Sequence, residues 1–493
     1  MIARLLFAAA PLFALVPATA SAQESAPAVS VEQMRRHIDI LASDAFEGRK
    51  PGTQGETKTL RYIADQFGAI GLEPAANGGW FQAVPLVERK PFAHRAIWSG
   101  DGGPIAFAQG DLVLLGTRPQ ESLSQAPVLF VGYGLPAQIE AIDPRGAIAL
   151  ILSDVPEKLG APGYSERAKA LTEAGAAAVI AIMGDDVPWS ALQSYYGRGQ
   201  TRLAGDPRAP ITGAMPLAAG DRLVGAGGGE LASAGAAGFK PVRLGLSGSL
   251  DVSTQVRPYE SHNVIGRLKG SGDTGESLLY LGHWDHLGIC RPDDAEDRIC
   301  NGAVDNASGI AMLIEIAREI AAGPRPARDL LFMGTTAEEI GLLGAEYFGA
   351  HPVVPIESLV AAINIDTVAI SPAGEPVAIV GRGTTPLDPL VDATARELGR
   401  AVDSDEEANA FVQRQDGWAL TRAGVPTVMV GGSFANMKIL GAFLSGPYHK
   451  PEDDLERPLV LEGAAEDTEL LIALGRKLAD PSQYDPEPES AAR

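Results

Sequence analysis

The sequence predicts an α/β protein with a mostly parallel, mixed sheet sandwiched by helices. From about residue 262 onward, short apolar runs that are typical of buried strands alternate with helical segments. Such alternation is typical of a parallel sheet whose crossover connections are helices. The chain has 493 residues, which is too many for one compact domain and sufficient for two.

The predicted elements follow from hydrophobic periodicity and from turn residues. Strands are expected at 277–281, 330–334, 359–365, 377–380 and 426–430. Helices are expected at 308–321, 344–350, 387–398 and 460–478. Residues 30–72 are expected to be helical with a break at 47–53. From about Val84 the pattern changes to short β-like runs in a region rich in Gly, Ala and Pro.

This middle region is interpreted as an inserted domain, because it contains almost no candidate catalytic residues. The expected organisation is a signal peptide at 1–22, the first part of a catalytic domain at 23–90, a β-rich insert at 91–250, the rest of the catalytic domain at 251–480 and a flexible tail at 481–493. Apolar residues make up 45% and charged residues 21%, which is typical of a soluble globular protein.

The formal net charge of −22 argues against nucleic acid or anionic lipid as a partner, because affinity for phosphate backbones is carried by Lys and Arg.

The N-terminus has the pattern of an export signal. Arg4 precedes an apolar stretch from Leu5 to Val16, and Ala20-Ser21-Ala22 is a cleavage site of the A-x-A type. The alternative is a membrane anchor, but the stretch is shorter than the roughly 20 residues that a spanning helix needs. The sequence therefore predicts a periplasmic or secreted protein with no stable membrane insertion after the signal is removed.

Cys290 and Cys300 are the two cysteines of the chain. In an exported protein they are expected to form a disulfide. A thiolate metal site is the alternative, but such sites usually combine three or four Cys or His ligands.

Chemically active residues follow three of the predicted strands directly. One strand leads into His283, the next leads to Glu338-Glu339, and a third ends on Asp366. Ligands of open α/β sheets bind beyond the carboxyl ends of the strands, so these side chains are expected at one edge. The helix that begins near Asp305 starts from the same edge.

Imidazole and carboxylate groups are the preferred non-sulfur ligands of zinc, and cations relieve the repulsion between crowded carboxylates. Neighbouring side chains diverge, so we expect one of the two glutamates to bind metal and the other to face the substrate water. Taken singly, each residue also has a structural interpretation, because His after a strand is often merely hydrogen-bonded and Asp often caps a helix.

At these motifs the sequence resembles the M28 family of zinc exopeptidases, in the subgroup with a protease-associated insert. The matching segments are His283-Trp284-Asp285-His286-Leu287-Gly288, Asn301 to Gly309, Ala337 to Gly344, Asn364-Ile365-Asp366, Tyr448 to Asp453, and, near the N-terminus, Leu41 to Asp44, Gly48-Arg49 and Pro51-Gly52-Thr53. The resemblance covers nearly all of the mature chain and is weakest in the insert. It implies a phosphorylase/hydrolase-like zinc-exopeptidase fold and peptide substrates.

The resemblance also implies roles for residues at matching positions. Two zinc ions per chain would be bridged by Asp305, with His283 and Asp366 completing one site and Glu339 and His449 the other. Glu338 would be the general acid/base, Asp285 would steady His283 from behind, and Tyr448 would hydrogen-bond the tetrahedral intermediate. Many relatives carry Ser-Asp-His where this chain has Arg414-Gln415-Asp416-Gly417. The resemblance therefore does not determine the substrate specificity of the pocket near this segment.

Aminopeptidase activity is the favoured prediction, and three alternatives stay open. A carboxypeptidase of the same family needs a cationic clamp for the terminal carboxylate, and near the motifs only Arg382 and Arg414 offer one. A glutaminyl cyclase-like acyltransferase has the same fold with one zinc, and a non-catalytic binding protein is the third alternative. The sequence does not determine the oligomeric state.

Overall fold

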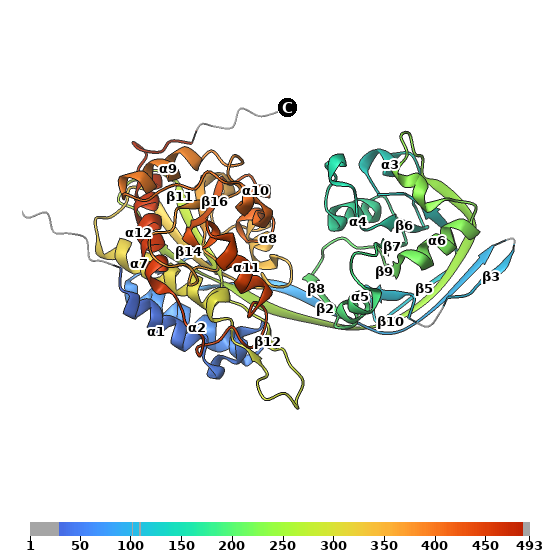
Figure 1. Ribbon diagram of the computed structural model, residues 1–493, viewed down its shortest axis with the longest axis horizontal. Helices are drawn as coiled ribbons and strands as arrows, with labels where there is room; N and C mark the ends of the chain where they lie inside the picture. The colour runs from blue at the N-terminus through green and yellow to red at the C-terminus, as the bar shows by residue number, and fades with distance from the viewer. Residues whose placement is uncertain (1–28, 101, 108–109, 487–493) are drawn as a thin grey trace, which may run out of the picture.

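The computed structural model describes residues 29–100, 102–107 and 110–486, so the predicted signal at 1–22 lies outside the described residues. Two lobes are joined by two long antiparallel strands, β2 (Phe81–Gly100) and β10 (Val242–Leu268) (Figure 1). The β structure expected from about Val84 onward is found, but it begins with one long strand and not with short runs. Pairing with β10 keeps β2 extended over 20 residues, so that one strand carries the chain from the first lobe into the second.

The first lobe is built on a mixed sheet in the order β16-β17-β15-β11-β14-β10. Its strands, besides β10, are β11 (Ser277–His283), β14 (Asp329–Thr335), β15 (Leu359–Asn364), β16 (Ala378–Val380) and β17 (Thr427–Gly431). The central four strands are parallel, whereas β16 and β10 pair antiparallel at the two sides. The α/β class and the mostly parallel sheet are confirmed.

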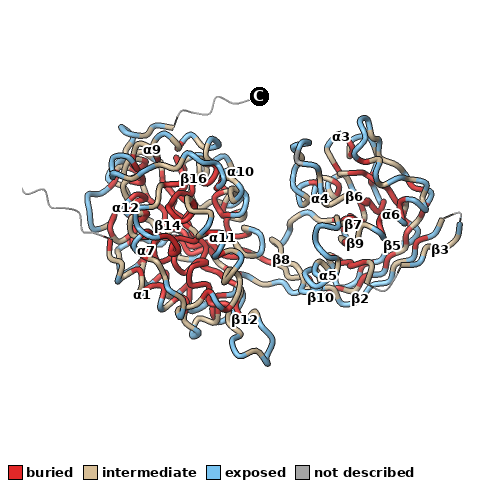
Figure 2. The backbone as a smooth tube through the Cα atoms, viewed as in Figure 1, coloured by how far each residue is buried: buried red, intermediate tan, exposed pale blue. Residues whose placement is uncertain are grey.

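Helices cover both faces of this sheet. They are α1 (Val31–Leu41), α2 (Gln54–Ile70), α7 (Gly309–Ala322), α8 (Leu343–Ala350), α9 (Asp388–Glu397), α10 (Gly417–Arg422), α11 (Met437–Ser445) and α12 (Leu461–Leu478). Successive residues of β11 point to opposite faces. Leu278 and Tyr280 join the core formed with α1, α2, α7 and α12, whereas Leu279 and Leu281 pack with Phe348 of α8. The central strands are therefore buried on both sides (Figure 2).

The second lobe has its own core, and its strands continue the sheet of the first lobe through β10. Its strands are β3 (Gly103–Ile105), β4 (Val113–Gly116), β5 (Gln120–Phe130), β6 (Ile148–Leu152), β7 (Ala178–Met183), β8 (Gln200–Leu203) and β9 (Ile211–Pro216), and its helices are α3 (Pro136–Glu140), α4 (Tyr164–Glu173), α5 (Trp189–Gly197) and α6 (Leu217–Ala226). The strands follow one another in the sheet in the order β10-β5-β6-β7-β9-β4. Trp98, Phe130 and Ile180 lie in its core. The domain boundaries at 91 and 250 fall inside β2 and β10, and the assignment of this lobe to a protease-associated domain stays a proposal.

Three short strands complete the strands of the described residues: β1 (Glu73–Pro74), β12 (Gly288–Ile289) and β13 (Ile299–Cys300). Within residues 29–100, 102–107 and 110–486, no helix combines the length and the apolar character that crossing a bilayer requires.

Candidate metal centre

Three neighbouring parallel strands bring the predicted residues to one edge of the sheet. His283 is the last residue of β11 and lies beside Thr335, the last residue of β14. Glu338 and Glu339 follow β14 by three and four residues. Asp366 follows β15, which pairs with β11 on its other side. The parallel register therefore places His, Glu-Glu and Asp at adjacent strand ends.

Asp305 reaches this edge from the turn Ala303–Ser308, which precedes α7. The next side chain, Asn306, connects the turn to the sheet, because its amide donates to the carbonyl of Ile365 at 2.9 Å. Its amide oxygen accepts from the N–H of Gly309 at 2.9 Å and so caps the start of α7. The peptide bond between Asp305 and Asn306 is cis.

His449 lies in the loop between α11 and α12. Asp453 ties this loop to the Asp305 turn, because its carboxylate accepts from the backbone N–H groups of Val304 at 3.1 Å and Asp305 at 3.0 Å. Asp453 is fully buried and also pairs with Arg457 at 3.3 Å. One carboxylate thus positions two chain segments that are about 150 residues apart.

The first group of side chains gathers around His283. Its Nε2 lies 3.2 Å from Asp305 Oδ1, 3.6 Å from Asp366 Oδ1 and 3.9 Å from Glu338 Oε2. The donor atoms of His283, Glu338 and Asp366 all lie within 4.8 Å of one another, which is close enough for one metal ion.

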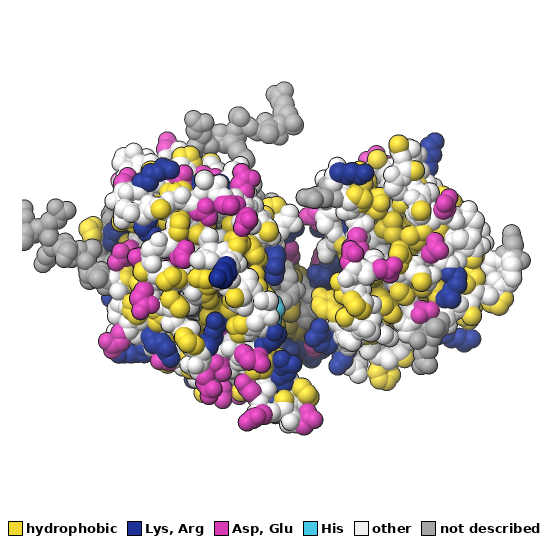
Figure 3. Space-filling model, viewed as in Figure 1, with side chains coloured by type: hydrophobic (Ala, Val, Ile, Leu, Met, Phe, Trp, Pro, Cys, Tyr) yellow, Lys and Arg dark blue, Asp and Glu magenta, His cyan; other side chains and the backbone are white. Residues whose placement is uncertain are grey.

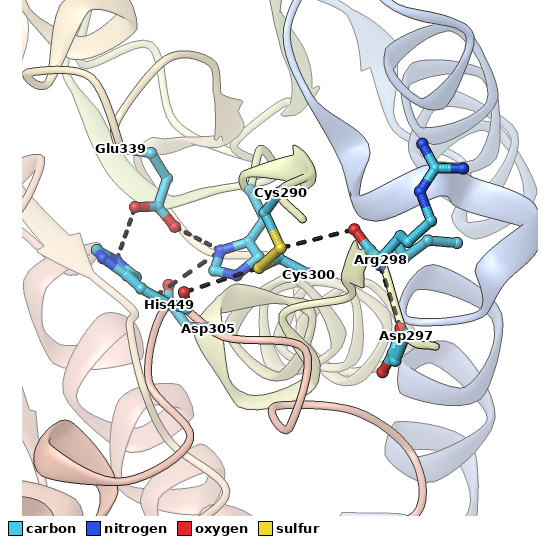
Figure 4. The surroundings of a disulfide bond; sticks show 9 residues. Cys290, Asp297, Arg298, Cys300, Asp305, Glu339 and His449 are labelled. Atoms are coloured by element: carbon cyan, nitrogen blue, oxygen red, sulfur yellow. Dashed lines mark hydrogen bonds and ion pairs between the residues drawn. A yellow bond between two sulfur atoms is a disulfide. The ribbon is translucent and has the colours of Figure 1, made fainter. Parts of the chain in front are cut away.

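The second group gathers around Glu339. His449 Nε2 lies 2.8 Å from Glu339 Oε2 and 3.3 Å from Asp305 Oδ2 (Figure 4). Asp305 therefore faces both groups, with Oδ1 toward His283 and Oδ2 toward His449. All five side chains that the sequence analysis named as metal ligands meet in this cluster.

His286 also belongs to the second group, and the sequence analysis gave it no role. Its Nδ1 contacts Glu339 Oε1 and lies 3.9 Å from Asp305 Oδ2, and the side chain is buried. The available signal was its place in the run His283-Trp284-Asp285-His286, three residues after a predicted ligand. β11 ends at His283, and His286 nevertheless contacts the same cluster.

Asp285 acts on the cluster differently from the expectation. His283 Nδ1 hydrogen-bonds the backbone carbonyl of Asp285 at 3.1 Å, whereas the Asp285 carboxylate lies 3.9 Å away. The carboxylate instead accepts from the backbone N–H of Glu338 at 3.1 Å. Asp285 therefore orients His283 through its main chain and Glu338 through its side chain.

Burial dominates the electrostatics of the cluster. Desolvation raises the pKa of Glu338 well above its usual range, and the neighbouring carboxylates of Asp416, Glu339 and Asp366 raise it further. Burial also acts to raise the pKa of Asp305, but the contacts from His283 and His449 outweigh it and hold that pKa well below its usual range. The two carboxylates therefore differ in proton affinity, as a base and a ligand do.

Asp416 lies close enough to the cluster to act on Glu338, in the segment Arg414-Gln415-Asp416-Gly417. Its carboxylate accepts a hydrogen bond from the hydroxyl of Thr335. Burial raises the pKa of Asp416 to about 6. Asp416 thus adds negative charge close to Glu338 and supports the end of β14.

Arg49 supports the cluster from the side of the N-terminal helices. Its guanidinium is buried and donates to the carbonyls of Trp284 at 2.8 Å, Asn301 at 2.6 Å, Gly302 at 2.8 Å and Leu41 at 2.8 Å. Four carbonyls use nearly all the donors of one guanidinium. The segments that carry His283 and Asp305 are therefore bound to one cation.

Tyr448 and the disulfide lie against His449. The Tyr448 ring stacks on the imidazole of His449 with centroids 3.7 Å apart. Cys290 and Cys300 form a disulfide that joins β12 to β13 (Figure 4). The sulfur of Cys300 lies 3.7 Å from the backbone oxygen of His449.

The donor set fits divalent cations. His449 Nε2 faces two carboxylates but has no hydrogen-bond partner among the described residues. Carboxylates and imidazoles that point at one another in a buried site repel unless a proton or a cation lies between them. Oxygen and nitrogen donors of this kind suit zinc.

Comparison with known proteins agrees with this chemistry. Residues 263–473 match the family model of peptidase family M28. A probable zinc metalloprotease of Pyrenophora teres f. teres is 33% identical over 157 residues, which cover 31% of this chain and 33% of that protein. Aminopeptidase NAALADL1 of Mus musculus is 29% identical over 170 residues, covering 33% of this chain and 21% of that protein. The matches thus span a third or less of these curated relatives.

The whole fold has a counterpart among solved structures. An aminopeptidase from Aneurinibacillus sp. strain AM-1 superposes with a TM-score of 0.55, covering 93% of this chain and 96% of that chain. The sequences are 19% identical, so the likeness is one of fold. It extends over both lobes of the chain.

Proposed function

Because residues 263–473 match the family model of peptidase family M28, we propose that this chain is a secreted or periplasmic zinc aminopeptidase that releases N-terminal residues from peptides. The relative from Mus musculus is named an aminopeptidase, which supports the choice of the N-terminal end. The export pattern of residues 1–22 supports the location.

The observation that carries the proposal is the position of Asp305 between two groups of donors. Its two oxygens lie 3.2 Å from His283 Nε2 and 3.3 Å from His449 Nε2. We assign one zinc ion to His283 and Asp366, a second to Glu339 and His449, and the bridging position to Asp305. When bound, two zinc ions supply Lewis acidity and lower the pKa of water toward 7.

Glu338 is the proposed general acid/base. Its carboxylate is 13% exposed and lies 3.9 Å from His283 Nε2, and the N–H of Glu338 donates to Asp285. A carboxylate with a raised pKa can accept the proton of the attacking water and return it to the leaving amine. Tyr448, whose ring stacks on His449, is proposed to donate a hydrogen bond to the oxyanion that develops on the scissile carbonyl.

Metal analysis combined with a peptide screen tests this proposal. The purified protein is expected to hold two zinc ions per chain and to hydrolyse peptides with a free N-terminus, but not the same peptides with an acetylated N-terminus. Chelation is expected to abolish the activity, and added zinc to restore it. If hydrolysis requires a free C-terminus instead, the protein is a carboxypeptidase. If the protein binds one zinc ion and forms pyroglutamate, it is a glutaminyl cyclase-like acyltransferase.

The variant Glu338→Gln tests whether Glu338 acts as the general acid/base or as a metal ligand. It is expected to retain both zinc ions and to lose about 10²- to 10⁴-fold in kcat, the usual contribution of a general acid/base. Glu357→Gln is the matched control, because Glu357 is exposed. Loss of one zinc ion in Glu338→Gln would mean that Glu338 is a ligand, as its place beside His283 and Asp366 also permits. Full activity of this variant would refute the assignment.

A further inference from the structure

The second lobe holds three arginines close together, on or just after the strands that face the first lobe. Arg89 lies on β2, Arg202 on β8 and Arg208 shortly after β8. The strands pair so that Val87 is opposite Arg202 and Arg89 is opposite Gln200. Burial, together with the charges of Arg208 and Arg202, lowers the pKa of Arg89 to about 10. The three guanidinium groups therefore repel one another at close range.

The cluster lacks the partners that buried cations normally have. Arg89 is only 3% exposed. Among the described residues, the Nε atoms of Arg89, Arg202 and Arg208 have no hydrogen-bond partner. Two carboxylates act on the cluster: Asp206 pairs with Arg208, and Glu346, which pairs with Arg422, favours the charged form of Arg202 from a distance. A buried, incompletely paired cation costs free energy, and a bound anion would recover it.

The cluster lies beside the loop that carries Glu338 and Glu339. Arg202 Nη1 is 3.9 Å from the position that a Cβ on Gly341 would take. A hydrogen bond from Gly341 N to Glu338 O, at 2.9 Å, closes the turn between these two residues. A turn of this kind spans less than about 7 Å, so the guanidinium lies within roughly 12 Å of Glu338 Cα, which is three or four extended residues.

Apolar contacts hold this arrangement in place. Leu203 of β8 packs against a buried cluster that includes Ala337 and Leu343, which flank the two glutamates. Arg422 of α10 pairs with Glu166 of α4 at 3.4 Å and also with Glu346 of α8, and so joins the two lobes. The space-filling view shows a furrow between the lobes with Lys and Arg side chains along it (Figure 3). A peptide that enters this furrow meets positive charge on the side of the second lobe.

We propose that Arg89, Arg202 and Arg208 form a subsite that binds a carboxylate of the peptide substrate, a few residues beyond the scissile bond. This inference rests on the proposed peptidase function and names its substrate class: short peptides with a free C-terminus, or peptides with an acidic side chain at that distance. A guanidinium binds a carboxylate through two parallel hydrogen bonds, which an ammonium does not match. Arg382 and Arg414 do not form this subsite, because Arg382 pairs with Asp392 and Arg414 stacks over Phe411.

The test compares substrates that differ only in one carboxylate. Leu-Gly-Gly-Gly is compared with Leu-Gly-Gly-Gly-amide, and Leu-Gly-Glu-Gly-amide with Leu-Gly-Gln-Gly-amide, by following the release of leucine. The wild-type protein is expected to show at least a tenfold higher kcat/KM for the charged member of one pair, the size of one lost charge-assisted hydrogen bond. The first pair reports a C-terminal carboxylate and the second an acidic side chain. Equal kcat/KM within both pairs overturns the proposal.

The variant Arg202→Gln tests whether the arginine cluster is the group that binds the substrate carboxylate. In this variant, the ratio of kcat/KM between the charged and the uncharged peptide is expected to fall toward one, mainly because KM for the charged peptide rises. The melting temperature of the variant is measured as well, to show that it is folded. Arg198→Gln is the matched control, because Arg198 is exposed in the same lobe and lies over the Tyr195 ring. An unchanged ratio in Arg202→Gln overturns the subsite. Failure of the peptidase function is a different result, in which none of the four peptides is cleaved even after zinc is added.

Discussion

His286 contacts the carboxylate of Glu339 through its Nδ1, and both side chains are buried. In the proposed assignment Glu339 is a zinc ligand, so His286 orients a ligand from behind. A partner of this kind typically contributes 10- to 100-fold to metal affinity.

His286→Ala is therefore expected to weaken zinc binding by about 10- to 100-fold without a loss of fold. The measurement is a competition titration with a chromophoric chelator. His351→Ala is the control, because His351 is exposed and stacks on Tyr347 away from the metal cluster. Unchanged zinc affinity in His286→Ala would contradict this role. Complete loss of one zinc ion would show that His286 is itself a ligand.

Arg49 is expected to be essential for stability, and lysine is not expected to replace it. An ammonium group cannot reach the four carbonyls that the planar guanidinium binds, and a buried carbonyl left without a donor costs about 1–3 kcal/mol. Arg49→Lys is expected to lower the free energy of unfolding by at least about 2 kcal/mol. Arg36→Lys, an exposed change on α1, is the control. Chemical unfolding curves measure the free energy of unfolding of both variants. Equal midpoints for Arg49→Lys and Arg36→Lys would contradict the prediction.

The stability of the metal-free protein is expected to fall as the pH rises from about 5 to 8. Burial raises the pKa of Asp285 from 3.8 to about 8, so the folded state binds more protons than the unfolded state in this window. Unfolding then becomes more favourable as the pH increases. The contacts of His449 with Asp305 and Glu339 outweigh burial and raise its pKa to about 10, which acts in the same direction above pH 6.5.

A bound divalent cation favours the carboxylate form and removes this penalty. The difference in melting temperature between zinc-saturated and chelator-treated protein is therefore expected to widen from pH 6 to pH 8, by about 3 °C or more. Differential scanning calorimetry at several pH values measures it. Asp285→Asn is expected to reduce the slope of the metal-free protein. A constant difference across this range would be incompatible with a raised pKa at Asp285.

The disulfide is expected to stabilise both the fold and the metal cluster. It closes a short loop, since Cys290 and Cys300 are 10 residues apart, and such a loop contributes about 2–3 kcal/mol. The double variant Cys290→Ser/Cys300→Ser is expected to lose this amount and to bind zinc more weakly, because Cys300 lies next to the backbone of His449. Thermal unfolding with and without a reductant gives the measurement. Reductant is expected to affect only the wild-type protein, and an equal effect on both proteins would exclude the disulfide as the cause.

Much of the first lobe could be predicted from local patterns. The strand β11 was expected at 277–281 and runs over Ser277–His283, and the helix α12 was expected at 460–478 and runs over Leu461–Leu478. Buried parallel strands are continuous apolar runs, and long helices have a strong period, so both can be recognised without their neighbours. The positions of His283 and Glu339 at strand ends followed from the same runs.

The sequence by itself determined which elements form and which residues end the strands of the catalytic sheet, because hydrophobic period and turn residues are local properties. Only the tertiary structure decided that Asp453 holds the His449 loop against Asp305, that Arg49 binds four carbonyls, and that Arg202 of the second lobe lies beside Gly341. These contacts join residues that are far apart in the chain. Their formation depends on how whole elements pack, and no local pattern of residues records it.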